Sequence, residues 1–102
     1  MAIYQIHFKA NPVLWPKDPK ERLDYTEAMF QGADELIKAG VMQEVAWVSS
    51  SEGYARVESD SAAAALAVCA MFFPMYTQDV QELVPWDVAK DAIVRAVRQA
   101  AG

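Results

Sequence analysis

The sequence predicts an α+β fold in which an antiparallel sheet packs against helices. Three observations predict it. Residues 3–10 alternate between apolar and polar side chains, which is typical of a strand with one face on a core. Helix start and stop signals bracket residues 18–40, and two β-rich runs between 42 and 59 are separated by turn residues. The predicted order is strand, helix, strand, strand, helix, strand, with one more helix at the C-terminus.

The first predicted strand runs from Ile3 to Ala10. Its side chains form two sets on opposite faces, with Tyr4, Ile6 and Phe8 on one and Gln5, His7 and Lys9 on the other. The apolar set belongs to the core. The polar set contains the only histidine of the chain and a lysine two residues later, so this face is the first candidate for chemistry.

The first helix is predicted from Pro19 to about Ala39. Asp18 suits the N-cap, Pro19 the first helical position and Glu21 the capping-box position. Gly40 suits a left-handed residue after the helix. The side chains expected to face the core, at spacings of three, four and seven, are Leu23, Phe30, Ala33, Leu36 and Ile37.

Residues 11–17 connect the strand to this helix and contain two prolines, which prevent regular structure. Two interpretations are open for this segment. It is either a packed connecting loop or a lid, with Trp15 closing over a pocket at the end of the strand.

The second half of the chain supplies the remaining elements. The predicted strands are Met42–Ser49, Tyr54–Ser59 and Gln78–Val84, and the first two form a hairpin across residues 49–53. The predicted helices are Ala62–Phe73, which starts at Asp60-Ser61 and ends at Pro74, and a last helix over about 87–100.

The predicted helix Ala62–Phe73 has no polar face. A helix that is apolar on every side is normally buried on every side. One sheet of a small domain cannot provide that cover, so we expect either another subunit or the C-terminal helix to complete it.

Composition restricts the class of protein. The chain has 102 residues, which fits one domain over 1–102, and 54% of them are hydrophobic. A net charge of −5 and a pI near 4.7 argue against a nucleic-acid partner. The one cysteine, Cys69, excludes an internal disulfide, and the absence of a leader pattern or a long apolar run favours a soluble, cytoplasmic protein with no membrane segment. One histidine and scattered carboxylates give no metal-ligand spacing, so neither a metal nor another cofactor is expected.

The order of elements is the split βαβ pattern of the ferredoxin-like fold. Right-handed crossovers place both main helices on one face of a four-stranded antiparallel sheet, with the first and third strands at its centre. The other face then carries Gln5, His7 and Lys9 beside Tyr54 and Arg56. Pairing two such faces would produce a homodimeric α+β barrel with a partly enclosed polar cavity.

Three stretches resemble the dimeric α+β barrel superfamily over roughly residues 3–84. Residues 6–9, Ile-His-Phe-Lys, are similar to the His-x-Lys first strand of the muconolactone isomerase family. Residues 71–76, Met-Phe-Phe-Pro-Met-Tyr, are similar to that family's Leu/Phe-Pro-Tyr stretch, and residues 53–60 resemble small uncharacterised barrels of the superfamily. The resemblance implies a homodimer and, within the isomerase family, cofactor-free proton transfer.

The candidate site residues follow from this chemistry. An isomerase that acts beside a carbonyl group needs a base to move the proton and a cation to hold the enolate. His7 suits the first role, and Lys9 or Arg56 the second. Tyr54 could orient a carbonyl group and Trp15 could cover the ligand.

Each candidate also has a structural interpretation. His7 could hydrogen-bond across the barrel, Lys9 could be a solvated charge and Tyr54 a packing residue. Arg56 could pair with one of three carboxylates, those of Glu58, Asp79 and Glu82.

Three functions therefore stay open. The leading hypothesis is a homodimeric barrel that binds a small organic acid or an aromatic or lactone-like ligand, with isomerase activity through His7. The alternative is a binding or assembly module without chemistry. A further alternative is a cofactor-free monooxygenase that uses the tryptophans and the cavity.

Overall fold

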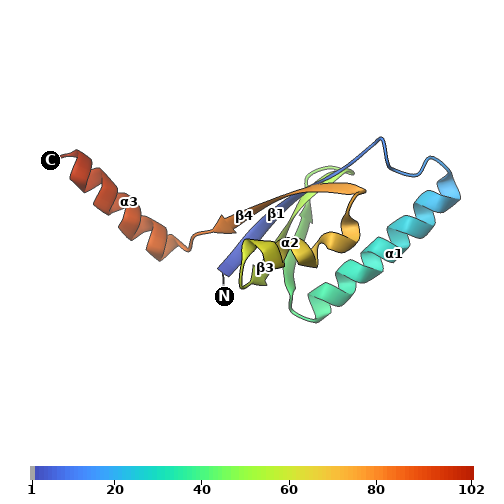
Figure 1. Ribbon diagram of the computed structural model, residues 1–102, viewed down its shortest axis with the longest axis horizontal. Helices are drawn as coiled ribbons and strands as arrows, with labels where there is room; N and C mark the ends of the chain where they lie inside the picture. Colours follow the sequence, from blue (N-terminus) through green and yellow to red (C-terminus); the bar gives the residue numbers. More distant parts are fainter. Residues whose placement is uncertain (1) are drawn as a thin grey trace.

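The computed structural model describes residues 2–102 and has an α+β fold with ferredoxin-like topology (Figure 1). Its elements are β1 (Ala2–Ala10), α1 (Pro19–Lys38), β2 (Met42–Trp47), β3 (Glu52–Ser59), α2 (Ala62–Val68), the 3-10 turn η1 (Ala70–Phe72), β4 (Tyr76–Leu83) and α3 (Trp86–Ala100). The strands form one antiparallel sheet in the order β2-β3-β1-β4. The predicted fold class and the central position of the first and third strands are confirmed.

The core lies on one face of the sheet, where the apolar sets of β1 and β3 meet. Tyr4 is in register with Val57 and Ile6 with Ala55, and all four side chains are buried. Cys69, which follows α2, packs against this cluster. The alternation of β1 therefore has the predicted direction, and its polar set lies on the opposite, open face of the sheet.

The ends of α1 agree with the sequence, but its predicted core stripe is wrong in part. The Asp18 carboxylate accepts a hydrogen bond of 3.1 Å from the backbone N–H of Glu21, and Gly40 has φ of 77°. Leu23, Phe30 and Ile37 nevertheless remain about half exposed, whereas Met29 is buried. The reason is that α1 does not lie closely on the sheet, and an apolar cleft separates the two.

The helix predicted over 62–73 is shorter than expected. The Ser61 hydroxyl caps its start by accepting a 3.1 Å hydrogen bond from the N–H of Ala64. The α-helix then ends at Val68 and the chain tightens into η1. Pro74 accounts for the end of η1, because a residue before proline is disfavoured in the helical region, and Phe73 has an extended backbone with φ −86° and ψ 142°.

The strands near the hairpin also differ from their predicted bounds, since β2 ends earlier and β3 begins earlier. Gly53, predicted in the turn, is buried within β3 and opposite Phe8. A methyl group at this position would meet the carbonyl oxygen of Ala46 and the ring of Phe8. Glycine is therefore needed here for a close approach of two strands, and sequence reasoning took it for a turn residue. β4 likewise begins at Tyr76, two residues before its predicted start.

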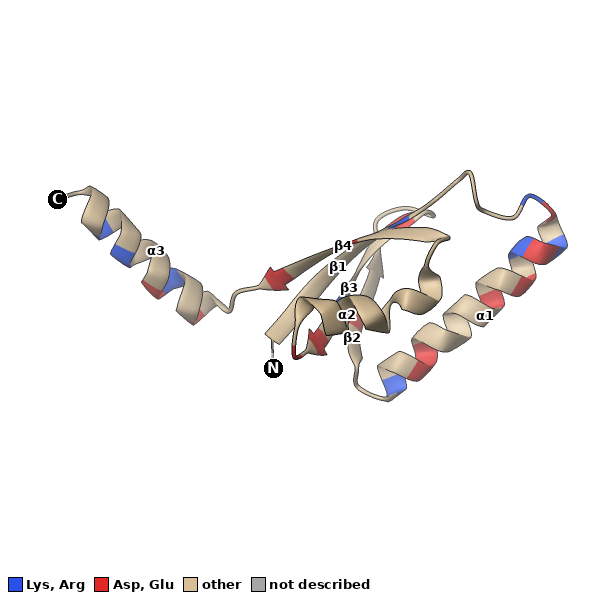
Figure 2. Cartoon of the chain, in the orientation of Figure 1, with Lys and Arg blue, Asp and Glu red and all other residues tan. Residues whose placement is uncertain are grey.

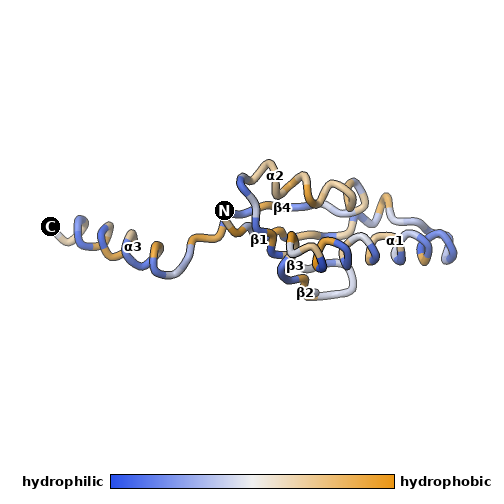
Figure 3. The backbone as a smooth tube through the Cα atoms, turned by 90° about the horizontal axis from the view of Figure 1, so that it is seen from below, coloured by the Kyte–Doolittle hydropathy of each residue, from blue (hydrophilic) through white to orange (hydrophobic). Residues whose placement is uncertain are grey.

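The C-terminal helix α3 projects away from the rest of the molecule (Figure 1) and contributes to an elongated shape of 63 × 28 × 21 Å. All its residues except Ala89 are exposed, although hydrophobic residues recur along it (Figure 3). Pro85, with extended backbone at φ −56° and ψ 149°, directs the chain outward from β4. The idea that this helix covers α2 is therefore wrong, and Leu66 on α2 stays half exposed.

Candidate functional site

The candidate site is on the open face of the sheet, where the polar set of β1 meets its neighbours on both sides. His7 is in register with Tyr54 on β3 and with Asp79 on β4, and Gln5 is in register with Arg56. Side chains in register across neighbouring strands point to the same face. The sheet thus brings His7, Tyr54 and Arg56 together on one surface, as the sequence predicted.

The His7 imidazole lies between two carboxylates. Its Nε2 atom is 3.0 Å from a carboxylate oxygen of Glu52, and its Nδ1 atom is 3.8 Å from an oxygen of Asp79. The Tyr54 ring stacks on the imidazole with centroids 4.9 Å apart and planes inclined by 29°. Nε2 is shielded from solvent, and its approach to Glu52 has the distance of an ion pair without the angles of a hydrogen bond. A proton on either ring nitrogen would therefore have a carboxylate beside it.

A hollow of about 270 Å³ lies next to this cluster. Gln5, Glu44, Ala46, Tyr54 and Arg56 line it. The Arg56 guanidinium is 3.8 Å from the Glu44 carboxylate, and both side chains are about half exposed. One edge of the guanidinium is thus engaged, while its other N–H groups can donate to a molecule in the hollow.

The partner of Arg56 corrects the sequence analysis. Glu58, Asp79 and Glu82 were the expected partners, but Glu44 on β2 makes the ion pair. Glu44 is directly opposite Arg56 across the β2–β3 ladder, whereas Glu82 is in register with the core residue Tyr4. Glu58 instead accepts a 2.9 Å hydrogen bond from the side chain of Gln43.

Lys9 and Trp15 lie outside the His7 cluster. Lys9 is exposed near the end of β1, and within residues 2–102 its ammonium group makes no ion pair. Trp15 packs edge-to-face on Tyr25 and Tyr76, at centroid distances of 5.5 and 5.6 Å. Tyr76 faces the helix side, where it contacts Phe8. The sheet therefore separates Trp15 from His7.

Glu52 and Asp79 are the site residues that sequence reasoning missed. The sequence pattern assigned Glu52 to the turn. In the structure β3 starts at Glu52, and Glu52 and Tyr54, two residues apart in one strand, point to the same face. Asp79 was considered only as a partner of Arg56. One signal could have identified both residues: each is a carboxylate on a strand that pairs with β1, at a position whose side chain points to the open face.

Metal-ligand clusters and membrane-spanning helices are both missing from the part of the chain that the structure describes. Among residues 2–102, no group of three or more His, Cys, Asp and Glu side chains is arranged to hold a metal ion. In the same range, no helix has both the length and the apolar character needed to cross a membrane.

Comparison with known proteins adds no assignment. The sequence matches no protein-family model, and no curated protein matches it significantly.

Proposed function

We propose that this protein forms a homodimer in which two open sheet faces enclose a cavity for a small lactone-like or aromatic organic ligand. The observation that supports this most is the His7 cluster, a histidine between two carboxylates beside a hollow, on the sheet face opposite the one against which α1 and α2 lie. Ligand sites typically combine concave surfaces with a few convergent polar groups. The resemblance of residues 6–9 to the muconolactone isomerase family is consistent with this site.

The charges of the open face favour uncharged ligands within this class. Its ionised side chains are Glu44, Glu52, Glu58, Asp79, Lys9 and Arg56. Carboxylates outnumber cations, so a free organic anion is attracted only close to Arg56. A lactone or another carbonyl compound avoids this repulsion, and the ring of Tyr54 offers it an aromatic surface.

The proposed reaction is an isomerisation by proton transfer. The Nδ1 atom of His7 takes a proton from the carbon next to a carbonyl group, because Nε2 is shielded beside Glu52, and the electron pair moves toward the carbonyl oxygen. Arg56 donates N–H groups to the resulting enolate oxygen, with Lys9 as the other cation on this face. The proton returns to a different carbon, so the double bond shifts and no other reactant is needed. Glu52 and Asp79 flank the imidazole on either side during both steps.

The binding experiment is a thermal-shift screen of lactones, hydroxylated aromatics and small organic acids. A ligand at 100 times its Kd stabilises the folded protein by about 2.7 kcal/mol, which raises the Tm by roughly 10–20 °C. We expect His7→Ala to weaken the response. The control Gln81→Ala, on the same face but outside the cluster and the hollow, should respond like wild type.

The reaction is tested by exchange of ligand protons with D2O, followed by ¹H NMR. The wild type should exchange the protons next to the carbonyl group of a bound ligand, and His7→Ala should lose this exchange by roughly 100-fold or more. Binding without exchange in the wild type would argue against isomerase activity. An unchanged exchange rate in His7→Ala would exclude His7 as the base.

An assembly function is the second candidate, and one observation favours it. The apolar residues of α3 and the outer side of α2 remain exposed, as is typical of surfaces that associate. If no compound in the screen changed the Tm of the wild type or of His7→Ala, assembly without chemistry would be the better conclusion.

A further inference from the structure

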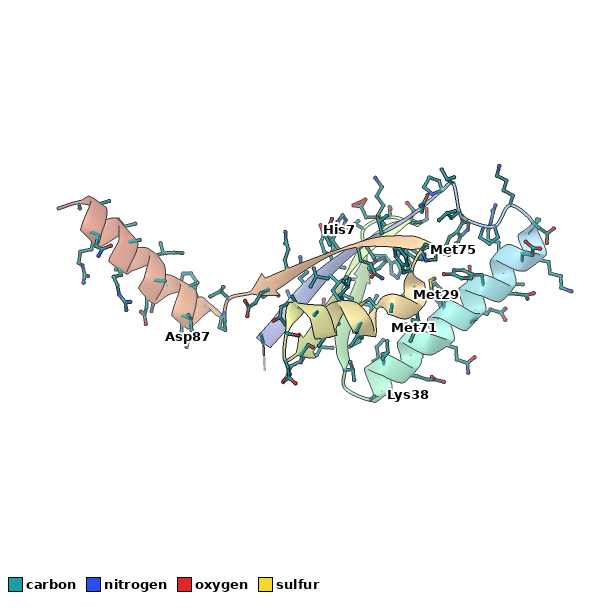
Figure 4. All side chains as sticks on the ribbon, in the orientation of Figure 1. His7, Met29, Lys38, Met71, Met75 and Asp87 are labelled. Atoms are coloured by element: carbon teal, nitrogen blue, oxygen red, sulfur yellow. The ribbon has the colours of Figure 1, made fainter. Side chains whose placement is uncertain are left out.

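A second cavity lies on the opposite side of the sheet, in the cleft between α1 and the strands. It has a volume of about 280 Å³, near the lower end of ligand pockets, which are roughly 300–1,000 Å³. The sheet supplies its floor, including Ile6 and Ala55, and α1 supplies Met29, Phe30 and Ala33. Met29 and His7 lie apart (Figure 4): Met29 lines the cavity on α1, whereas His7 follows the floor residue Ile6 along β1 and so points to the other face of the sheet.

Aromatic rings dominate one part of this cleft. Trp47 contacts Phe8, Phe30 and Tyr76 edge-on, with centroids 5.0, 6.2 and 6.5 Å apart. All four rings line the cavity. Trp47 and Phe30 are also more than 40% exposed, so they cover the cleft without filling it. Such a set of rings accepts a flat apolar group and also attracts cations to the ring faces.

Asp34 is the only ionisable carboxylate in the lining, and it is one helical turn from Phe30. No Lys, Arg or His among residues 2–102 lies within ion-pair distance of it. It also belongs to an acidic helix, since α1 carries five acidic and three basic residues (Figure 2). Asp34 is exposed, so it lies at the rim of the cleft, and a carboxylate there without an ion-pair partner is complementary to a positively charged ligand.

We infer that this cleft binds a small organic cation that carries one or two apolar rings. Its rings pack on Phe30, Trp47 and Tyr76, and its ammonium group donates hydrogen bonds to the Asp34 carboxylate. This site is distinct from the His7 cluster, because the two lie on opposite faces of the sheet. The cleft selects cations, whereas Arg56 on the open face would attract anions.

The test is isothermal titration calorimetry of the full chain with tryptamine, and with indole-3-propionate as a probe with the same ring and the opposite charge. We expect tryptamine to bind and the acid to bind at least about tenfold more weakly. Asp34→Asn should lower the affinity for tryptamine by about tenfold. Glu35→Gln is the matched control, because it removes the same charge from the adjacent residue outside the cleft, and it should leave the affinity unchanged.

Two further variants test where the amine binds. Ala33→Leu places a larger side chain in the cleft, and leucine, like alanine, favours the helix. The variant should bind tryptamine more weakly, while its circular dichroism spectrum stays like that of the wild type. His7→Ala should leave tryptamine binding unchanged, so the result is independent of the function proposed for the open face.

Several results would overturn the inference. Equal affinity for the amine and the acid would show an apolar pocket without charge selection. Equal losses in Asp34→Asn and Glu35→Gln would show attraction to the acidic chain as a whole. Absence of tryptamine binding, or binding that appears only when light scattering shows an oligomer dissociating, would mean that the cleft has another occupant, such as a second copy of the chain.

Discussion

The position of Glu52 decides which groups surround His7 on the open face of the sheet. The period-two pattern of β1 and β3 is enough to place His7, Tyr54 and Arg56 on one surface, because alternation fixes the direction of every side chain. It does not fix where a strand begins. Glu52 entered the cluster only because β3 starts two residues earlier than its apolar pattern indicates. The imidazole therefore has a carboxylate that sequence reasoning assigned to a turn.

Trp15 could not be placed from the sequence, because a loop with two prolines has no periodicity to indicate a direction. Its packing on Tyr25 and Tyr76 puts it on the helix side of the sheet. Burial raises the pKa of both tyrosines, and their mutual repulsion when ionised raises that of Tyr76 further. These three rings extend the aromatic surface around the cleft rather than the His7 site.

Cys69 gives a prediction at the residue scale. Its thiol is buried, and burial raises its pKa from 9.0 to about 11. A group whose pKa is higher in the folded state contributes stability that is complete below its unfolded pKa and is lost as the pH rises through the folded pKa. We therefore expect Cys69 to lower the free energy of unfolding between pH 9 and 11, by roughly 2 kcal/mol at the upper end.

Urea unfolding of wild type and Cys69→Ala over this pH range measures the effect. The variant should be less stable at neutral pH, because of lost packing, and its stability should fall less steeply above pH 9. Tyrosine ionisation is common to both proteins and cancels in the comparison. Parallel curves would contradict the assignment of alkaline sensitivity to this thiol.

At the scale of elements, sequence signals were reliable where local chemistry decides the structure. Caps at Asp18 and Ser61 and the left-handed Gly40 are local features, and each is present. Packing of one element on another is not encoded locally. The distance between α1 and the sheet, which leaves Phe30 and Ile37 half exposed, therefore could not be derived from helical periodicity.

Gly53 gives a prediction at this scale. Gly53→Ala should destabilise the fold by about 1–3 kcal/mol, because the added methyl group meets the Ala46 backbone, which cannot move without disturbing the β2–β3 ladder. Gly32→Ala is the matched control. There the methyl group would meet only the flexible side chain of Met71, and alanine favours the helix, so we expect a change within about 1 kcal/mol.

Urea unfolding monitored by circular dichroism distinguishes these two variants. If Gly53→Ala proved as stable as wild type, the backbones of β2 and β3 would have to lie further apart at Gly53 and Ala46 than in this structure. Equal losses in both variants would indicate that alanine is tolerated no better against a flexible side chain than against backbone.

At the scale of the whole molecule, the open sheet face and the projecting α3 both lack cover within one chain. The proposed homodimer would have twice the 11.3 kDa of the chain, and multi-angle light scattering at micromolar concentration measures this mass directly. Ala46→Glu, which adds a charge beside Tyr54 and Glu44 on the open face, should shift the mass toward the monomer. Buried charges without a partner are strongly unfavourable at an interface.

Ala28→Glu adds the same charge to an exposed position of α1 and should leave the dimer intact. A wild-type mass equal to that of one chain would exclude the facing-sheet arrangement. A dimer that resists Ala46→Glu would show that the contact lies elsewhere, with the exposed apolar residues of α3 as the next surface to examine.

The two outer strands of the sheet determine how such molecules can associate. Within residues 2–102, β2 and β4 each have one edge whose backbone amides and carbonyls have no neighbouring strand, a geometry that can recruit further chains into fibrils. β2 carries an irregularity between Met42 and Glu44, and β4 carries Asp79 and Glu82. Bulges and charges at strand edges oppose such growth. The fold therefore discourages edge-to-edge polymerisation, which is consistent with the face-to-face contact of the proposed homodimer.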